Sequence, residues 1–333
     1  MNPVEFMACP ECSGDLKQSP VNHDLFCEVC GKVIKFFDGI YYADTSPYSS
    51  EAKQTIAEFG KRWKKVYKKM GGLKDFLLPT IEPVKKEFFR GKCIIDGGGG
   101  FGRLTKIMLD YGARHVVLLE ASDAVLAAKS YLENYRDKVT IIKGNLLKSP
   151  LAEGSFDLFF CHGVLHHTGD PRKVILSMSR TVDKQKGCMI LWVYAQEGNR
   201  GLSRLVNLIR FFSLKIGDWG RWRLGALIDI VLWLLTKCVY IPLLLLAVPK
   251  QRLWYGTYFI DFLFNPEINN RVDRLQMYHD FMTTDIIEYY SKSQLEQWVK
   301  EADYKTATFY FYRNQSWSVA ACYHPKEDFS GNQ

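Results

Sequence analysis

Five glycines within the six positions 97–102 constrain the fold of this chain more than any other feature. They follow a short apolar stretch, residues 93–95, and the acidic Asp96, and they precede a segment of helical character that begins at Leu104. Glycines lack Cβ atoms, so backbone N–H groups there can approach a ligand closely, and a helix N-terminus favours negative charge. The run therefore predicts a strand, a ligand-binding turn and a helix.

A second acidic residue ends the next predicted strand. Residues 116–119 are apolar, and Glu120 follows them, twenty-four positions after Asp96. An acid at the carboxyl end of the second strand can accept both hydroxyl groups of a ribose. We therefore expect a ligand that carries a nucleoside.

The glycine run fits two patterns, and a glycine-rich turn alone is weak evidence because it can simply connect a strand and a helix tightly. One is the dinucleotide fingerprint on Gly97, Gly99 and Gly102, and the other is the first motif of S-adenosylmethionine methyltransferases on Asp96, Gly98, Gly100 and Gly102. Downstream segments decide between them. The sequence predicts a third strand over 139–143, a fourth strand with a loop and a capped helix over 155–171, and a fifth strand over 187–194.

This order of strands, with the stretch from Phe156 to Pro171, resembles class I S-adenosylmethionine-dependent methyltransferases over residues 90–195. The resemblance implies an α/β fold with a Rossmann-like, doubly wound sheet of seven strands. It implies S-adenosylmethionine as cofactor and favours a methyltransferase over a NAD-dependent dehydrogenase.

The resemblance also implies roles for individual residues. Asp96 and Gly98 are expected at the methionine end of the cofactor, Gly100 and Gly102 at the turn, and Glu120 at the ribose. Further contacts are expected from Asn145, where the family often has an Asp that accepts from the adenine amino group, and from Cys161 and His162, beside the reactive sulfonium. An Asn oxygen still accepts a hydrogen bond, but the charge is gone.

Four cysteines near the start form two CxxC knuckles separated by fourteen residues: Cys9, Cys12, Cys27 and Cys30. Paired thiolates on two turns can share one tetrahedral Zn²⁺, and four thiolates leave no open coordination position. We therefore expect a structural zinc ion in a ribbon over residues 1–45; two disulfides or free thiols are the alternatives. The module resembles zinc ribbons fused ahead of some methyltransferases, and it could recognise substrate, bind a partner or cover a sheet edge.

The other five cysteines lie in apolar surroundings and are expected in the core rather than as nucleophiles: Cys93, Cys161, Cys188, Cys238 and Cys322. The start of the sequence shows no secretory pattern, so the expected location is cytoplasmic, with a peripheral position at a membrane left open.

A helix is expected over residues 51–70, after a short polar linker at 46–50. Its aromatic residues recur at helical spacing and include Phe59 and Trp63. It can be an amphipathic helix packed on the core, or a lid over the cofactor, because methyltransferases of this type often carry a Phe-Gly-x-x-Trp helix before the first motif. Phe59 and Trp63 are therefore also expected at the cofactor.

Residues 198–265 form an apolar insertion after the fifth strand, and the span 224–248 is long enough to cross a bilayer. One crossing would separate the helix expected at 293–302 and the strand hairpin at 304–323 from the rest of the sheet. We therefore favour a helical cap that buries its apolar face on the core over contact with a membrane. Residues 191–250 carry eight Lys/Arg against three Asp/Glu, as expected for lipid headgroups or an anionic substrate.

Methyl transfer is a displacement at an activated sulfonium, so the protein must align the reactants and, for some acceptors, remove a proton. Imidazoles suit proton removal. His162 is the first candidate base, and His279 or Asp280 is the second. Weaker candidates are His166 and His167, which follow the family loop motif. Tyr290 is expected only as a residue that could line the substrate pocket.

Five segments are expected: the ribbon 1–45, linker and lid helices 46–90, the first five strands 91–197, a substrate cap 198–290, and the last helix with the terminal hairpin 291–325. The favoured function is methylation of a small, apolar acceptor in biosynthesis. The alternatives are an RNA methyltransferase that uses its ribbon to recognise ribosomal or transfer RNA, and a non-catalytic interaction protein. The chain carries a modest net charge of +8, with no evident strip for stacking bases.

Overall fold

The computed structural model describes residues 2–43, 53–58, 60, 77–246, 271, 274–275, 278–279, 282, 287–324 and 329. The chain divides into two compact units. We call the first the sheet unit (residues 1–196, 285–312 and 316–333) and the second the helical unit (residues 197–284 and 313–315).

The sheet unit contains one sheet of eleven strands, not the seven expected. The strands are β1 (Leu16–Gln18), β2 (Leu25–Cys27), β3 (Val33–Phe37), β4 (Ile40–Tyr42), β5 (Cys93–Gly97), β6 (His115–Glu120), β7 (Val139–Lys143), β8 (Leu158–His162), β9 (Cys188–Tyr194), β10 (Thr306–Tyr312) and β11 (Ser316–Cys322). Their order is β1-β2-β3-β4-β7-β6-β5-β8-β9-β11-β10. The number differs because β4 pairs with β7 and so joins the N-terminal strands to the seven of the core.

Strands β5 to β9 run parallel, and their sequences explain why. All five residues of β5 and the first five of β6 are buried, as expected for strands covered on both faces. β5 lies between β6 and β8, where the strand order reverses direction, so ligands are expected at its carboxyl end. The terminal hairpin β10–β11 is present as expected, with β11 antiparallel to β9.

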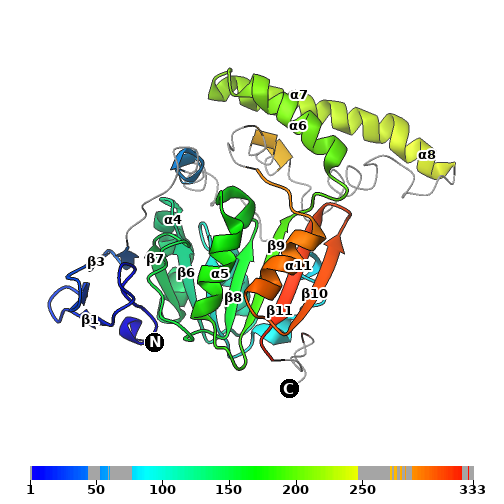
Figure 1. Cartoon of the computed structure of the whole chain (residues 1–333). Helices are drawn as coiled ribbons and strands as arrows, with labels where there is room; N and C mark the ends of the chain where they lie inside the picture. The colour runs from blue at the N-terminus through cyan, green and yellow to red at the C-terminus, as the bar shows by residue number, and fades with distance from the viewer. Residues whose placement is uncertain are drawn as a thin grey trace. The chain divides into compact units, whose positions relative to one another are not determined.

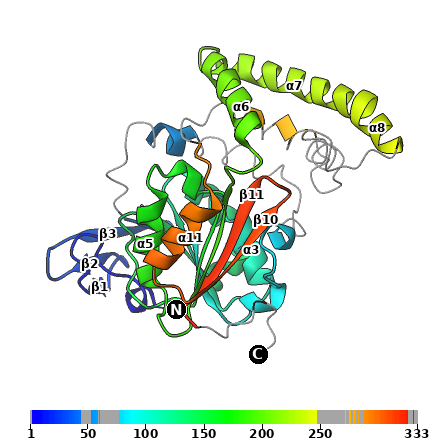
Figure 2. The same ribbon diagram turned by 45° about the vertical axis from the view of Figure 1, so that its right-hand side comes forward.

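Helices cover both faces of this sheet (Figures 1 and 2). The helical segments of the unit are η1 (Pro3–Glu5), α2 (Leu77–Thr80), η3 (Lys86–Phe89), α3 (Arg103–Asp110), α4 (Ala124–Tyr131), η4 (Glu133–Lys138), η5 (Leu165–His167), α5 (Pro171–Thr181) and α11 (Lys292–Glu301). Residues of α3 and α2 pack with one face of β5 and β8, and residues of α5 and α11 pack with the other. The capped helix expected after Asp170 is α5, whose Lys173 N–H donates to the Asp170 carboxylate at 3.0 Å.

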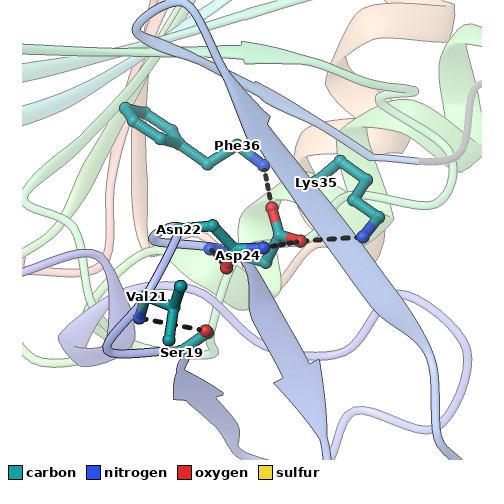
Figure 3. A network of polar contacts seen from close by, with 6 residues as sticks. All are labelled: Ser19, Val21, Asn22, Asp24, Lys35 and Phe36. Atoms are coloured by element: carbon teal, nitrogen blue, oxygen red, sulfur yellow. Dashed lines mark hydrogen bonds and ion pairs between the residues drawn. The ribbon is translucent and has the colours of Figure 1, made fainter.

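The N-terminal strands form a small module held by one carboxylate (Figure 3). Asp24 accepts from the backbone N–H of Phe36 at 2.7 Å and from Lys35 Nζ at 2.8 Å, and Asn22 Nδ2 donates to it at 3.0 Å. The Lys35 ammonium, followed by that N–H, lowers the pKa of Asp24. These bonds tie the loop before β2 to β3. The next strand, β4, lies parallel to β7, so the module covers that edge of the sheet.

The helical unit contains α6 (Arg200–Ser213) and a longer continuous helix formed by α7 (Asp218–Leu235), the π-helical turn η6 (Thr236–Tyr240) and α8 (Ile241–Leu245). Among the described residues, the helix Asp218–Leu245 is long and apolar enough to cross a membrane by length and composition. Only 17% of the residues in its most apolar window are buried. Most apolar side chains of this helix are therefore not buried within the helical unit, and their packing on the core stays a prediction.

Four of the five cysteines outside the knuckles are buried as expected, two of them in a disulfide that the sequence did not predict, and one is exposed. Cys188 and Cys322, opposite each other on β9 and β11, are joined by a disulfide. Cys238 is exposed rather than in the core, whereas Cys93 and Cys161 are buried as expected. Adjacent antiparallel strands bring residues 134 positions apart into contact, and local sequence does not encode that pairing.

Candidate functional site

The carboxyl ends of β5, β6 and β8 surround a cavity of about 180 Å³. Five of the residues expected at the cofactor or the reacting methyl group line it: Gly98, Gly100, Glu120, Asn145 and His162. They come from four separate segments that the sheet brings together. The cavity therefore lies where parallel sheets of this order bind their ligands.

The glycine run is required by its surroundings. Gly98 has a φ of +76°, and a Cβ there would lie 2.5 Å from the Cγ atoms of Val164. A Cβ on Gly99 would lie 2.7 Å from Leu118 Cγ and 2.9 Å from Asp96 Oδ2. A side chain at either position would push the loop into the cavity or break its contacts with the sheet. Gly102, the N-cap residue of α3, has no side chain to cap the helix, whose positive dipole end favours an anion; the N–H of Thr105 in the first turn already donates to Asp96.

Glu120 also lines the cavity. Its Oε2 accepts from the N–H of Gly100 at 3.1 Å, and its Oε1 accepts from the N–H of Ser122 at 2.7 Å. The carboxylate is thus oriented by the glycine loop on one side and by the turn after β6 on the other. Each carboxylate oxygen has a second acceptor site, which is the requirement for a ribose diol.

Asn145 carries an unused hydrogen-bond donor. Its side chain is fully buried, and its Oδ1 accepts from the N–H of Leu147 at 2.8 Å. Its Nδ2 has no hydrogen-bond partner among the described residues. The sequence predicts that the Asn oxygen faces the ligand, but here that oxygen is bonded within its own turn, so the amide N–H₂ is the free group.

Three expected cofactor residues lie off the cavity: Asp96, Gly102 and Cys161. Asp96 is buried beneath Gly99, where the Thr105 hydroxyl donates to its Oδ2 at 2.5 Å. Burial, with the nearby Glu120 charge also raising it, shifts the pKa of Asp96 to about 6. Cys161 is fully buried, and burial raises the pKa of its thiol, which is therefore protonated. These positions support the loop rather than form the cavity wall.

His162 is held in one tautomer. Its Nε2 lies 2.9 Å from Thr80 Oγ1, and that hydroxyl gives its single proton to Leu77 O at 2.7 Å. Thr80 must therefore accept, so His162 Nε2 carries the proton. The ring stacks on Trp192 at 4.7 Å, and burial, followed by the Arg103 charge, lowers its pKa to about 3. An imidazole with this pKa is neutral at physiological pH and is a weak base.

The other described candidates, except His167, do not line the cavity. His279 belongs to the helical unit, where its Nε2 lies 2.8 Å from Asp218 Oδ1 and its ring stacks on Trp222. Burial lowers the pKa of His166 far below the usual value, whereas His167 lines the cavity. Tyr290 is buried, and its hydroxyl donates to Glu288 at 2.6 Å. Asp280, Phe59 and Trp63 lie outside the described residues.

The structure adds cavity residues that sequence reasoning missed: Thr55, Ile56, Arg103, Leu146 and Val164. Thr55 and Ile56 belong to the helical stretch 53–58, the described part of the helix expected over 51–70. The Thr55 hydroxyl is buried and has no partner among the described residues. Arg103 follows the last glycine of the run, a position that could have suggested a cation at the ligand.

The four knuckle cysteines converge as expected. Their Sγ atoms all lie within 4.8 Å of one another, with Cys9 to Cys30 at 3.4 Å and Cys12 to Cys27 at 3.5 Å. Sulfurs bound to one tetrahedral Zn²⁺ at 2.3 Å would be about 3.8 Å apart, so the cluster has the size and the donor set of a zinc site. The backbone N–H of Cys30 lowers the pKa of Cys27 to about 7 against the effect of burial.

Comparisons with known proteins agree with this site. Residues 95–191 match the family model described as a methyltransferase domain. Protein arginine N-methyltransferase 1 from Saccharomyces cerevisiae is 26% identical over 108 residues, which cover 29% of this chain and 31% of the yeast protein. The chain thus spans about a third of the length of that curated relative.

Solved structures resemble the chain more distantly. The 1,6-didemethyltoxoflavin-N1-methyltransferase of Burkholderia thailandensis is 10% identical and has a TM-score of 0.45, with 87% of this chain and 94% of that chain covered. A complex of the Trm112 methyltransferase activator and a methyltransferase from Haloferax volcanii gives 11% identity and a TM-score of 0.46, with 84% of this chain and 100% of that chain covered. The family match rests on the segment that carries the glycine loop, Glu120 and Asn145. Residues 95–191 therefore form a class I S-adenosylmethionine-dependent methyltransferase domain.

Proposed function

We propose that the whole chain is an enzyme that transfers a methyl group from S-adenosylmethionine to a small, largely apolar acceptor. The observation that carries this proposal is the convergence of Gly98, Gly100, Glu120 and Asn145 on one cavity at the carboxyl edge of a parallel sheet. When bound, the cofactor supplies an activated methyl group on a positively charged sulfur. The chain must then hold that group, exclude water and align the acceptor with it.

The residues present fit this cofactor. The Glu120 carboxylate would hold the ribose, and the cationic Arg103 with the positive dipole end of α3 would hold the carboxylate of the methionine part. Asn145 Nδ2 and Thr55 Oγ1 are buried polar atoms at the cavity that lack partners among the described residues. A free Asn N–H₂ donates, so it suits a ring nitrogen of adenine, which accepts. Leaving such atoms unpaired costs about 1–3 kcal/mol each, so a ligand that pairs them gains affinity.

We propose that the reaction needs no histidine base. Two of the candidate histidines line the cavity, His162 and His167, and holding a second proton on the buried His162 ring is unfavourable. The Thr80 hydrogen bond and the Trp192 stack support a role in which His162 forms a fixed, neutral wall. An acceptor that is already nucleophilic, or one that loses its proton to water after transfer, fits such a site.

The acceptor is proposed to enter from the carboxyl end of β9. The chain leaves the sheet unit after Gln196 and re-enters before Tyr290, and the two segments pair: Tyr290 N–H donates to Tyr194 O at 3.0 Å, and Gln196 N–H donates to Tyr290 O at 2.9 Å. Both roots of the insertion therefore lie at the edge that holds the cavity, which supports residues 198–290 as the segment that handles the acceptor.

Aromatic rings gather at these roots. His166 lies 4.2 Å from Tyr194 and 6.3 Å from Trp192, measured between ring centroids. Trp192 Nε1 and His166 Nδ1 are both buried, with no hydrogen-bond partner in the part of the chain that the structure describes. These three residues do not line the cavity itself, so the proposal of an apolar acceptor rests on apolar residues that do, among them Ile56, Leu146 and Val164.

For the N-terminal module we propose a structural zinc ion on Cys9, Cys12, Cys27 and Cys30. Its charge argues against RNA recognition, because residues 1–43 hold three lysines against six acidic residues. Binding of nucleic acid needs an excess of cations at the surface that meets the phosphates. We therefore place the RNA methyltransferase second, with the sheet-edge role of β4 as the simpler account of the module.

Calorimetry with S-adenosylhomocysteine on zinc-replete full-length protein tests the cofactor. We expect binding of S-adenosylhomocysteine and none of NAD. Glu120→Gln is expected to weaken the binding of S-adenosylhomocysteine at least tenfold, because hydrogen bonds to a charged group are worth about 1.5–3 kcal/mol each. Glu153→Gln, a change of an exposed carboxylate, is the matched control. Uptake of NAD instead would contradict the proposal.

Transfer of labelled methyl groups tests the acceptor class. Incorporation into a small-molecule extract that survives nuclease treatment would support the leading proposal. Incorporation that appears only with added RNA would instead support the second.

A further inference from the structure

The long helix of the helical unit exposes an apolar stripe, while its inner face combines apolar residues packed on Tyr278 and Met282 with the buried polar residues Asp229 and Thr236. Leu227, Ile230, Val231 and Leu234 recur at i, i+3, i+4 and i+7, and each is between 47% and 56% exposed. We call these four residues the outer stripe. Gly225, Asp229, Thr236 and Tyr240 recur at similar spacing on the other side and are buried. A surface helix of a soluble protein instead places its polar residues toward water and its apolar residues toward the core.

The buried acid explains why the outer stripe is uninterrupted. Asp229 is 4% exposed, and Arg274 donates to both of its oxygens, from Nε at 2.9 Å and from a terminal nitrogen at 3.3 Å. Tyr278 OH donates to Oδ1 at 3.4 Å, and Arg271 lies 3.4 Å from Oδ2. The carboxylate within the apolar stretch is thus neutralised inside the unit. Burying this ion pair costs desolvation free energy. The cost is understandable if the exposed face of the helix must carry no carboxylate.

The preceding helix also exposes large apolar side chains. Leu208, Phe211 and Phe212 of α6 are 56–58% exposed, and so are Trp219 and Trp233 of α7, at 68% and 46%. Singly exposed apolar residues are ordinary, but this many large ones on two successive helices indicate an interaction surface. Tryptophan in particular is enriched where an apolar phase meets water.

The charges that accompany this surface are cationic. Residues 200–246 hold seven Lys/Arg and two aspartates, one of which is the buried Asp229. The Arg223 guanidinium lies 3.5 Å from the centre of the Trp219 ring, and Lys215 Nζ lies 4.2 Å from that of Phe211. Cations beside exposed aromatic rings are typical of helices that lie in a bilayer interface with anionic headgroups.

The chain topology favours a helix in the plane of the membrane over one that crosses it. The strands before the insertion, β5 to β9, and those after it, β10 and β11, belong to one sheet, so the chain must return to the side it left. Among the described residues, Asp218–Leu245 is the one helix long enough to cross. At fourteen residues, α6 is about 21 Å long and too short to serve as the return crossing.

We propose that α6 and the helix Asp218–Leu245 dock in the plane of an anionic phospholipid surface, with the outer stripe and the tryptophans inserted and the basic residues at the headgroups. This function goes beyond methyl transfer and does not depend on it. It would concentrate the enzyme where apolar molecules accumulate.

Sedimentation of the full-length protein with lipid vesicles tests the proposal. We expect binding to phosphatidylcholine vesicles that contain phosphatidylserine, weaker binding without phosphatidylserine, and weakening by salt. Val231→Glu is expected to lower the partition coefficient about tenfold or more, because burying a valine side chain is worth about 1.5–3 kcal/mol. Val21→Glu makes the same change at an exposed valine of the N-terminal module and should leave binding unchanged.

Two further measurements keep the test decisive. Far-UV circular dichroism and binding of S-adenosylhomocysteine should be the same in Val231→Glu and the parent, which would show that the variant is folded. No binding to phosphatidylserine vesicles, or binding that Val231→Glu leaves unchanged, would overturn the proposal. The proposal would also be overturned if the protein did not bind vesicles but formed a dimer that Val231→Glu dissociates. The surface would then join two copies of this chain.

Discussion

Replacing Asp96 by asparagine should change how the stability of the protein depends on pH. Asp96 is 2% exposed, and burial raises its pKa to about 6, whereas an aspartate in the unfolded chain titrates near 3.9. Between these values the unfolded chain releases a proton that the folded chain retains. Stability is therefore present at low pH and is lost as the pH rises from about 4 to about 6. One pH unit is worth 1.36 kcal/mol, so the loss amounts to ~3 kcal/mol above pH 6.

The asparagine of the Asp96→Asn variant has no such titration. Its oxygen can still accept the proton of Thr105, but its amide N–H₂ would have to find an acceptor, at a cost that does not vary with pH. The quantity to measure is thus the difference in melting temperature between Asp96→Asn and the parent, at pH 4 and at pH 7.5. We expect this difference to shift in favour of the variant by roughly 6 to 12 °C between the two pH values, given ~3 kcal/mol and a unit of this size.

The control and the coupling test use neighbouring carboxylates. Asp137→Asn, at an exposed position, should show the same difference at both pH values. Glu120 adds to the raised pKa of Asp96, so in a Glu120→Gln background the shift produced by Asp96→Asn should become smaller. A difference for Asp96→Asn that is equal at pH 4 and pH 7.5 would refute the claim that the buried carboxylate costs stability.

Four further outcomes follow from the site and the cysteines. The kcat of methyl transfer should be flat from about pH 6 to 8, because His162, with a pKa near 3, stays neutral; a fall centred near pH 6.5 in the pH–rate profile would identify a histidine base after all. Asn145→Leu should weaken S-adenosylhomocysteine about tenfold by calorimetry, since the cavity loses its unpaired donor, whereas equal affinity would exclude a contact. Chelation should release one zinc ion per chain and lower the melting temperature, and metal analysis that finds none would leave the knuckles as free thiols. Thiol titration of the unfolded, metal-free and unreduced protein should count seven groups, because Cys188 and Cys322 are bonded; nine would contradict the disulfide.

The sequence predicted the features that local chemistry encodes. Strands β5 to β9 were expected because each is an apolar run bounded by turn residues, and the helix α5 was expected from the Asp170 cap followed by Pro171. The glycine loop and the two cysteine knuckles were evident because their chemistry depends on residue type and spacing within a few positions. The same holds for the terminal hairpin, whose strands are joined by a short turn.

The details of the site needed three dimensions. Nothing near Asp96 in the sequence indicates that its carboxylate lies under Gly99 rather than in the cavity, or that the Asn145 oxygen is bonded to Leu147. The neutral state of His162 depends on Thr80, which is 82 positions away. Burial and pairing set these properties, and both come from parts of the chain that are remote in sequence.

A methyltransferase domain, a four-cysteine cluster and an apolar insertion could all be predicted from the amino-acid sequence, because periodicity, spacing and turn chemistry are properties of short segments. The pairing of β4 with β7, and the inward position of Asp229 on Arg274 while Val231 faces outward, became evident from the folded chain. A short parallel pairing and a buried ion pair leave no local signal. Each forms between segments that the chain brings together from a distance, and its free energy depends on the water that the assembled structure excludes.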